Sequence, residues 1–454
     1  MKAIIIGAGV VGYAIAKRLS AEGQDVIIIE KNEKRIRDMQ ETLDVKVIQG
    51  SGSSPKVLKE ADIEHADMVI AVTDSDEVNM IACLIAGTQS SIPKKIARIR
   101  NQDYTQFTDI LGEGCLDIDF YINPERVAAE RILRIIEVPG ATDVVDFSDG
   151  IVKLVGLRID SDCSLTGKSL KNLAELHPGN KILIAAIYRG ADTIIPHGNV
   201  VLKEGDLVFV ITVPQSIPQV IKLFGKADIL GRKVMIVGGG NIGYYLARRL
   251  EDMAFQTKII EQNEQRCSFL AENLEKTLVL HGDGTDEELL REEGVEDIDT
   301  FITVTNDEED NILISLLGKN LGAQRVITLI NKPEYISLIS SIGVDVVVSP
   351  RLASVGGILQ FVRRGNIVSV TTLMEERMEA LETIALDTSD IVNIPLKDVK
   401  FAEGAIIGAI VRGEEVVIPD GNARIRPNDK VIIFAFQEAI AKVEKNLMVK
   451  LEYF

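Results

Sequence analysis

The sequence predicts an α/β protein made of two doubly wound parallel-sheet domains, each followed by a small α+β domain rich in hairpins. Three observations support this prediction. The chain has two glycine-rich turns of one pattern, "IIGAGVVGYAIAKRL" at residues 5–19 and "IVGGGNIGYYLARRL" at 236–250. Short β-branched runs alternate with helical patterns after each turn. Segments rich in tight turns then follow both of these regions.

Length and charge limit the classes of function. The chain has 454 residues, enough for several domains, and its net charge of −18 argues against nucleic acid or anionic lipid as a general surface partner. The four cysteines have no CxxC spacing, so neither a zinc cage nor a disulfide framework is expected. No stretch reaches the roughly 18 apolar residues of a membrane span. The apolar N-terminal run is expected to be a strand and helix and not a signal peptide.

The likeness between the two halves extends well past the glycine turns. The segment "VIIIEKNEKR" (26–35) corresponds to "TKIIEQNEQR" (257–266), and "VIQGSGS" (47–53) corresponds to "VLHGDGT" (279–285). The segment "MVIAVTDSDEVN" (68–79) corresponds to "TFITVTNDEEDN" (300–311). Each half therefore contains one copy of the same unit.

Each copy is expected to form a parallel sheet covered by helices on both faces, because its strands are nearly continuous apolar runs. In the first copy we expect strands near 2–6, 26–30, 46–48, 68–72 and 95–100, with helices near 10–21, 32–41, 54–60 and 77–88.

A weaker repeat follows each copy. The segment "AAIYRGADTIIPHGNVVLKEGDLVFVIT" (185–212) corresponds to "GAIVRGEEVVIPDGNARIRPNDKVIIFA" (408–435), and its strands are joined by tight turns. We expect these small domains to begin near 154–156 and 380–386. The predicted domains are residues 1–138, 139–228, 229–365 and 366–454.

Two helices are expected to connect large and small domains, because Pro124 and Pro350 each precede apolar residues at helical spacing. Such a helix packs either against a neighbouring subunit or the small domain, or against its own sheet.

The glycine turns predict two Rossmann-type nucleotide sites. The first glycine permits the bend, the second lets the backbone approach a phosphate, and the third lets helix and strand pack closely. Glu30 and Glu261 end the second strand at the same spacing after the turn, where a carboxylate binds ribose hydroxyls and repels the 2′-phosphate of NADP. Ligands of such sheets lie at the carboxyl ends of the strands.

The candidate residues lie in the turns and at those strand ends. In the first copy they are Gly7, Ala8, Gly9, Val10, Val11, Gly12, Glu30, Ser51, Thr73, Asp74 and Arg98. In the second copy they are Gly238, Gly239, Gly240, Asn241, Ile242, Gly243, Glu261, Asp283, Thr305 and Asn306.

The copies differ at the end of the fifth strand. "ARIR" (97–100) in the first becomes "ITLI" (327–330) in the second. Arg98 or Arg100 is suited to neutralising terminal phosphates, as in ATP. The alternative is a solvated arginine at a strand end.

Acidic clusters at 74–77 and 306–310 each begin a predicted helix. Helix capping explains them better than a divalent metal does, because acids in a first turn interact favourably with the helix dipole. No metal site is predicted.

Catalytic machinery is not evident in residues 140–225 and 370–454. They contain no nucleophile motif and no recognisable pair of catalytic carboxylates, so we expect a ligand sensor and not an enzyme. An NAD-dependent oxidoreductase with two half-sites is the main alternative, and a scaffold without ligand is a third.

These motifs, in the order large, small, large, small, resemble the TrkA family, cytosolic regulatory subunits of Trk potassium uptake systems. The resemblance covers essentially the whole chain. It implies tandem RCK (KTN) and TrkA-C domains that bind NAD(H) and ATP or ADP. It also implies a homotetrameric ring of eight RCK units beneath an integral-membrane potassium-translocating subunit of the TrkH or TrkG type, at the inner face of the cell membrane.

The resemblance assigns Glu30 to the ribose, Thr73 and Asp74 to the base or ribose, and Arg98 to phosphate, with matching positions in the second copy. One departure concerns the usual Gly-Asp after the third strand, which is Gly50-Ser51 in the first copy and Gly282-Asp283 in the second. We expect the second site to take a less charged ligand, such as NAD or ADP, or to be empty under some conditions. The response to ATP is expected to fall mainly to the first site.

Overall fold

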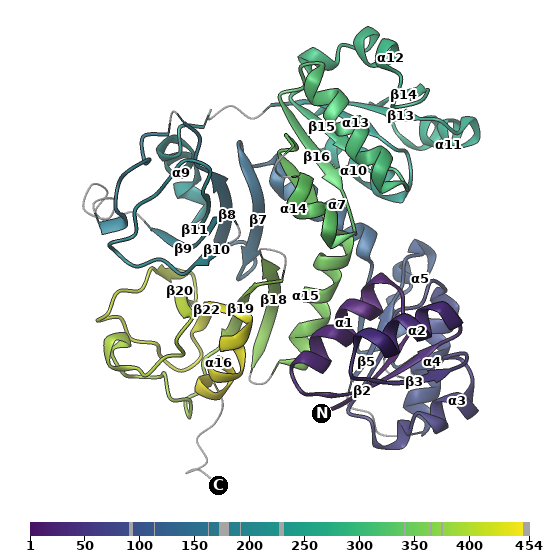
Figure 1. Ribbon diagram of the computed structural model, residues 1–454, viewed down its shortest axis with the longest axis vertical. Coiled ribbons are helices and arrows are strands. Elements are labelled where there is room, and N and C mark those ends of the chain that lie inside the picture. The colour runs from purple at the N-terminus through teal and green to yellow at the C-terminus, as the bar shows by residue number, and fades with distance from the viewer. Residues whose placement is uncertain are drawn as a thin grey trace. The chain divides into compact units, whose positions relative to one another are not determined.

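A computed structural model gives the structure of this chain (Figure 1). The described residues are 1–89, 94–112, 114–161, 163–171, 181–190, 192–226, 231–339, 342–363, 366–373 and 376–447. They divide into two compact units, one of residues 1–127 with 350–361 and one of residues 128–349 with 362–454.

The first large sheet belongs to the first unit and has the strand order β3-β2-β1-β4-β5-β6, with all neighbours parallel. Its strands are β1 (Lys2–Ile6), β2 (Asp25–Glu30), β3 (Lys46–Gln49), β4 (Met68–Ala71), β5 (Lys94–Arg98) and β6 (Phe120–Ile122). Its helices are α1 (Val10–Ala21), α2 (Glu33–Thr42), α3 (Pro55–Glu60), α4 (Asp76–Gln89), α5 (Gln102–Gln106) and α6 (Thr108–Leu111). The predicted doubly wound sheet is confirmed. Strand β6, helix α5 and helix α6 were not predicted, because they are very short.

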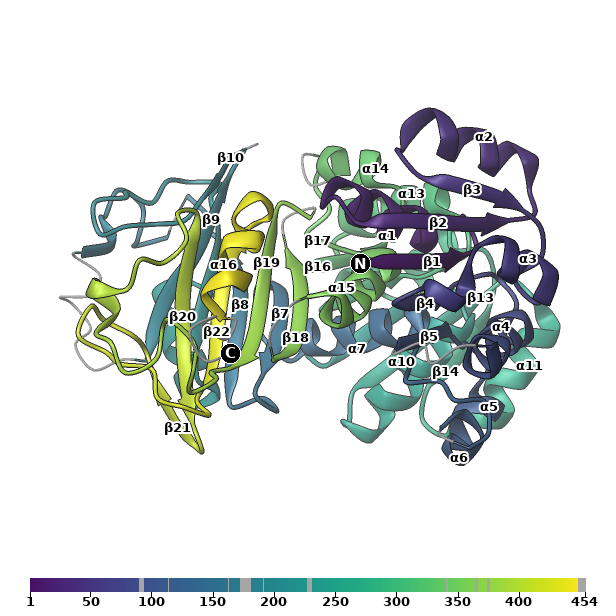
Figure 2. The same ribbon diagram turned by 90° about the horizontal axis from the view of Figure 1, so that it is seen from below.

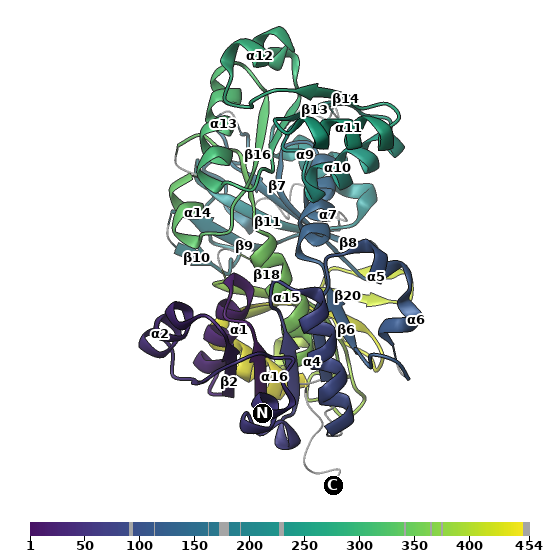
Figure 3. The ribbon, with the colours of Figure 1, turned by 90° about the vertical axis from the view of Figure 1, so that its right-hand side faces the viewer.

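The second large sheet belongs to the second unit and repeats this order as β14-β13-β12-β15-β16-β17. Its strands are β12 (Lys233–Val237), β13 (Gln256–Glu261), β14 (Leu278–His281), β15 (Thr300–Thr303), β16 (Arg325–Leu329) and β17 (Val346–Val348). Helices α10, α11 and α13 lie beside these strands (Figure 3). The helices of this sheet are α10 (Asn241–Asp252), α11 (Glu264–Asn273), α12 (Glu287–Glu292), α13 (Glu308–Asn320) and α14 (Pro333–Ile339).

The small domains form two five-stranded antiparallel sheets in the second unit, with the orders β10-β9-β11-β8-β7 and β18-β19-β22-β20-β21. The first comprises β7 (Ala141–Phe147), β8 (Val152–Arg158), β9 (Ile182–Arg189), β10 (Asp192–Ile194), β11 (Leu207–Thr212) and helix α9 (Ile217–Leu223). The second comprises β18 (Ile367–Leu373), β19 (Met378–Ile384), β20 (Ala405–Arg412), β21 (Glu415–Val417), β22 (Lys430–Phe436) and helix α16 (Ile440–Leu447). Each sheet has one strand, β7 or β18, before the predicted starts near 154–156 and 380–386, although both strands lie within the predicted domains 139–228 and 366–454.

An arginine and an aspartate form the same ion pair in both small sheets. Arg189 binds Asp206 through two hydrogen bonds of 2.7 Å, and Arg412 binds Asp429 at 3.0 and 2.8 Å. Each arginine ends a long strand and each aspartate lies in the turn before the last strand, so the pair joins two hairpins. This contact explains the spacing of Arg-Gly and Asp in both repeats.

The inner faces of the small sheets share one hydrophobic core. Phe147 and Phe434 pack edge to face with ring centroids 6.4 Å apart, and Ile211 lies against Gly408. Figure 2 shows strands β19, β20 and β22 beside β8 and β9. Each fully buried side chain of this kind contributes about 1.5–3 kcal/mol to folding.

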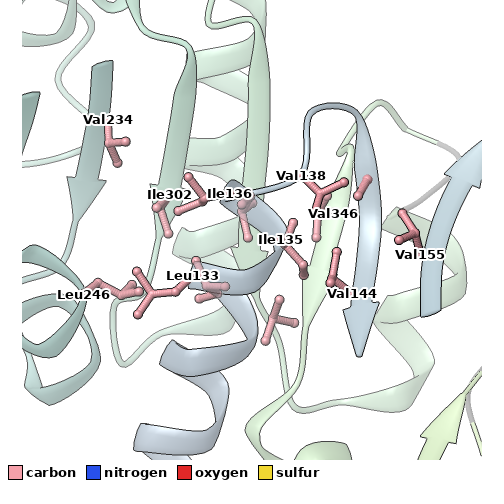
Figure 4. Close-up of a cluster of buried hydrophobic side chains, with 14 of the residues drawn as sticks. Leu133, Ile135, Ile136, Val138, Val144, Val155, Val234, Leu246, Ile302 and Val346 are labelled. Carbon is pink, nitrogen blue, oxygen red and sulfur yellow. The ribbon is translucent and has the colours of Figure 1, made fainter. Parts of the chain in front are cut away.

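The connecting helices are exchanged between the two copies. Helix α7 (Pro124–Ile136) follows the first large sheet, yet Leu133 and Ile136 point toward Leu246 and Ile302 of the second (Figure 4). Its C-terminal end also packs against β7 and β8 of the first small sheet. Packing against the small domain was one of the predicted alternatives. The contact with the other large sheet was not predicted.

Helix α15 (Pro350–Val362) makes the reciprocal exchange, because residues 350–361 belong to the first unit. Phe361 packs on Phe120 of β6 with ring centroids 4.7 Å apart, and Gly357 lies against Ile122. Both helices begin at their proline, as predicted. The domain limits 228 and 365 lie outside the described residues.

Candidate nucleotide-binding sites

Both glycine turns have the backbone geometry of a phosphate-binding turn. Gly7 and Gly238 have φ angles of +101° and +109°, which side chains rarely tolerate. A Cβ atom on Gly12 would lie 1.9 Å from the carbonyl oxygen of Gly7, and a Cβ atom on Gly243 would lie 1.9 Å from the carbonyl oxygen of Gly238. The third glycine therefore lets the helix approach the strand, as predicted.

The second glycine of each turn is open to an incoming ligand. Gly9 and Gly240 are the N-caps of α1 and α10 and have extended backbone. A Cβ atom on Gly9 would meet only Arg35 Nη1 at 4.0 Å, and one on Gly240 would meet nothing within 4 Å. Free N–H groups at a helix N-terminus attract anions.

The two predicted ribose acids are held by backbone N–H groups of the turn. Glu30 Oε2 accepts a hydrogen bond of 2.6 Å from Ala8 N, and its Oε1 accepts bonds of 2.7 and 2.9 Å from Lys31 N and Asn32 N. Glu261 accepts bonds from Gly239 N at 2.7 Å and Asn263 N at 2.8 Å. Both acids therefore fix the turn, a structural role that the sequence did not reveal.

The predicted threonines are positioned by two buried asparagines that sequence reasoning missed. Asn79 Oδ1 accepts bonds of 2.9 and 2.7 Å from Thr73 N and Oγ1, and its amide donates to Arg98 O at 2.9 Å. Asn311 makes the same contacts with Thr305 and Leu329. Asn79 and Asn311 are the last residues of the matching segments 68–79 and 300–311, and this shared position could have identified them.

Arg98 is the last residue of β5, and burial lowers the pKa of its guanidinium. Its Nη1 lies 3.5 Å from Thr73 O, and its buried Nε has no hydrogen-bond partner among the described residues. A buried cation without a full set of acceptors is costly, and an anionic ligand would supply them. Arg100, the other candidate, donates to the carbonyl oxygen of Asp74.

In the second copy, most predicted residues line one cavity of about 630 Å³. Its predicted lining residues are Gly238, Gly240, Asn241, Glu261, Asp283, Thr305 and Asn306. Gly239 is engaged with Glu261 instead, while Ile242 is buried and Gly243 contacts the turn. In the first copy, Val10 is exposed at the start of α1, and Val11 is buried.

Arg266 also lines this cavity and was not predicted. Its Nε donates to Gly239 O at 2.6 Å and its Nη2 to Gly240 O at 3.3 Å, while its guanidinium lies 4.4 Å from the centre of the Phe269 ring. The counterpart Arg35 is half exposed and 3.8 Å from Glu30. Both arginines occur in a shared Glu-x-Asn-x-x-Arg pattern, which could have identified them.

The residue after the third strand differs between the copies, as the sequence indicated. Asp283 Oδ1 accepts bonds of 2.9 and 2.8 Å from the backbone and hydroxyl of Thr285, which lower the pKa of its carboxyl group. In the first copy, Ser51 Oγ lies 2.9 Å from Ser53 Oγ. The second cavity therefore carries an additional negative charge.

The acidic clusters act at helix starts. Asp307 is the N-cap of α13 and accepts a bond from Asp310 N at 3.0 Å, which confirms the capping interpretation there. Asp76 instead accepts bonds of 2.8 Å from the backbone of Arg100 and Asn101, so it ties α4 to the end of β5. Within the described part of the chain, no helix is both long and apolar enough to cross a membrane.

Two domain families match this chain twice each. The TrkA-N domain matches residues 3–124 and 234–350, and the TrkA-C domain matches residues 154–225 and 381–448. The chain belongs to the TrkA family of Trk system potassium uptake proteins. The resemblance inferred from the motifs is therefore confirmed.

Relatives of this TrkA family member match it over the full length. It is 40% identical to the Trk system potassium uptake protein TrkA of Azorhizobium caulinodans and 41% identical to that of Halomonas elongata, with 100% of each chain covered. A TrkA homologue of Methanosarcina mazei is 38% identical over 98% of this chain and 99% of its own. All three relatives are named as components of a potassium uptake system and not as enzymes. These names agree with the prediction that the chain is not an enzyme.

Solved structures share the fold of this TrkA family member. A crystal structure of the GsuK RCK domain has a TM-score of 0.62 and 18% identity, and it covers 98% of this chain and 94% of its own. The GsuK channel bound to NAD also has a TM-score of 0.62, covering 98% of this chain and 78% of its own. At this identity the likeness shows the fold alone, and it confirms the predicted architecture.

Proposed function

We propose that this chain is the nucleotide-sensing regulatory subunit of a Trk potassium uptake system. It binds NAD(H) and ATP or ADP, and the bound nucleotide changes the arrangement of its domains. Family membership supports the potassium system, and the NAD-bound GsuK channel supports a dinucleotide as one ligand. The observation that carries nucleotide binding is the cavity that joins the glycine turn, Glu261, Asp283 and Thr305 in the second copy.

The first site is proposed to bind the more highly charged ligand, ATP. The turn from Gly7 to Val11 holds phosphate through backbone N–H groups, Glu30 binds the ribose, and Arg98 neutralises the terminal phosphates. The buried Nε of Arg98, which has no hydrogen-bond partner in the part of the chain that the structure describes, supports this assignment. Among the described residues of the second site, Leu329 and not an arginine takes the place of Arg98, because the equivalent asparagines bind Arg98 O and Leu329 O. This pairing lies one residue later than the comparison of 97–100 with 327–330 implies.

Regulation requires that nucleotides bind two domain arrangements with different affinity. We propose that the chain assembles as a homotetramer, a ring of eight RCK units, under an integral-membrane subunit that translocates potassium. Nucleotide binding in that ring controls the membrane subunit from the cytoplasmic side.

Calorimetric titration of the wild type, Gly9→Asp and Gly240→Asp with ATP, ADP, NAD⁺ and NADH tests the binding sites. Both glycines have open surroundings and ordinary backbone, so the substitutions leave the fold intact while placing a carboxylate against the phosphate. We expect Gly9→Asp to abolish ATP binding and Gly240→Asp to abolish binding at the second site. Wild-type protein that binds none of the four nucleotides would refute the proposal.

A further inference from the structure

The second cavity has two halves with different surroundings. Glu261 ends β13 on one side of the glycine turn, and the segment Thr305–Asp307 follows β15 on the other side. In a doubly wound sheet the adenosine ribose lies at the acid that ends the second strand, and the pyrophosphate lies on the glycine turn. The other half of a dinucleotide therefore extends toward β15 and the start of α13.

That second half is lined by negative charge. Asp307 and Asp310, both exposed to solvent, contribute carboxylates there. Lys332 is the nearby cation after β16, but it binds Glu309 at 2.6 Å and does not line the cavity. The positive end of α13 is thus offset by the acids of its own first turn.

The cation that lines the cavity, Arg266, is fixed in the adenosine half. Its hydrogen bonds to Gly239 O and Gly240 O and its contact with Phe269 hold it over the glycine turn. It also lies on the α11 side of the sheet, which follows β13. Arg266 therefore stands where it can neutralise a pyrophosphate on the glycine turn. It forms no ion pair with Asp307 or Asp310 among the described residues.

The first copy differs in charge in the corresponding place. Arg98 ends β5 and Arg100 follows it, and the carboxylate of Asp76 accepts hydrogen bonds from the backbone N–H groups of Arg100 and Asn101. The counterparts of Asp307 and Asp310 in the first copy are the uncharged Ser75 and Val78, so the acidic lining is specific to the second copy.

We propose that the second site selects the oxidised dinucleotide NAD⁺ over NADH, with Asp307 and Asp310 as the specificity-determining residues. This proposal rests on dinucleotide binding at the second site. The nicotinamide ring is cationic only when oxidised, so the two carboxylates attract it in NAD⁺ and have no such interaction with NADH. The Coulomb attraction of this cation to two solvated carboxylates favours NAD⁺ by about tenfold.

The test is a calorimetric titration of the Gly9→Asp protein with NAD⁺ and NADH, so that binding at the second site is measured alone. We expect NAD⁺ to bind about tenfold more tightly, with a smaller preference at high salt because salt screens exposed charges. The double substitution Asp307→Asn and Asp310→Asn should reduce the preference to less than about twofold. Asparagine retains the N-cap, so α13 is preserved.

The matched control is Glu292→Gln, which removes one exposed carboxylate outside the cavity and should leave the preference unchanged. Equal affinity for NAD⁺ and NADH in the Gly9→Asp protein would overturn the selectivity while leaving nucleotide binding intact. A preference that survives the double substitution would overturn the roles of the two aspartates. Binding of neither dinucleotide would overturn dinucleotide binding at the second site, on which the selectivity rests, whereas ATP binding by the wild type tests the proposed function separately.

Discussion

The backbone N–H of Gly239 donates a 2.7 Å hydrogen bond to the carboxylate of Glu261. One side chain thus shapes the glycine turn and also stands where a ribose would bind. The same relationship joins Ala8 and Glu30 in the first copy, at 2.6 Å. In both copies the phosphate turn and the ribose acid form one connected element, so a change in either is expected to affect both.

Glu261→Gln should weaken both the fold and nucleotide binding of the second large domain. The amide presents only one acceptor oxygen, so either Gly239 N or Asn263 N loses its partner, at a cost of about 1–3 kcal/mol. Urea denaturation measures the stability, and titration with NAD⁺ in the Gly9→Asp background measures the binding. Unchanged stability would show that the turn does not depend on the carboxylate.

Gly243→Ala should destabilise the protein while Gly240→Ser should not. A Cβ atom on Gly243 would lie 1.9 Å from Gly238 O, so helix α10 must move away from its strand at a cost of about 1–3 kcal/mol. Serine at Gly240 has open space and is a good N-cap, so we expect a change within about 0.5 kcal/mol. Thermal unfolding without nucleotide compares the two variants, and equal melting temperatures would contradict the packing role of the third glycine.

Arg98→Leu gives the first site the residue that the second copy has at this strand end. We expect at least about a tenfold loss in ATP affinity, because a charge-assisted contact to phosphate disappears. Stability should be unchanged or slightly higher, since a partly desolvated cation is removed. The control is Arg37→Gln, which removes an exposed arginine of α2. Unaltered ATP affinity would exclude Arg98 from the phosphate site.

Asp283→Asn should change how stability depends on pH. The carboxyl group of Asp283 has a lowered pKa because of the backbone and hydroxyl hydrogen bonds of Thr285. A lowered pKa stabilises the fold above the unfolded value of about 3.9, and this contribution is lost as the pH falls through the folded value. The wild type should therefore exceed Asp283→Asn in stability at pH 6, by about 0.5 kcal/mol or less because the group is exposed.

Urea denaturation between pH 6 and pH 3 follows this difference, which should shrink below about pH 4. Glu292→Gln is the control, because it neutralises an exposed carboxylate outside the cavity. A difference that grows toward low pH would contradict the assigned direction of the pKa shift.

The glycine turns, the two acids and the strands of the doubly wound sheets were predictable, because each depends on residues close together in the chain. Arg266 and Asn311 were missed, since their roles depend on carbonyl oxygens that only the folded turn brings near them. The packing of α7 against the second large sheet was also not predicted. Apolar spacing defines the buried face of a helix but not which of two similar sheets covers it.

The exchange of α7 and α15 has a consequence for any attempt to halve this chain. A cut at the repeat boundary would leave each fragment with a connecting helix whose apolar face fits the other fragment's sheet. Neither half would be self-sufficient, although each contains a complete copy of the repeat. Half-length chains with this topology would have to fold as pairs, in which the connecting helix of each fragment packs against the large sheet of the other.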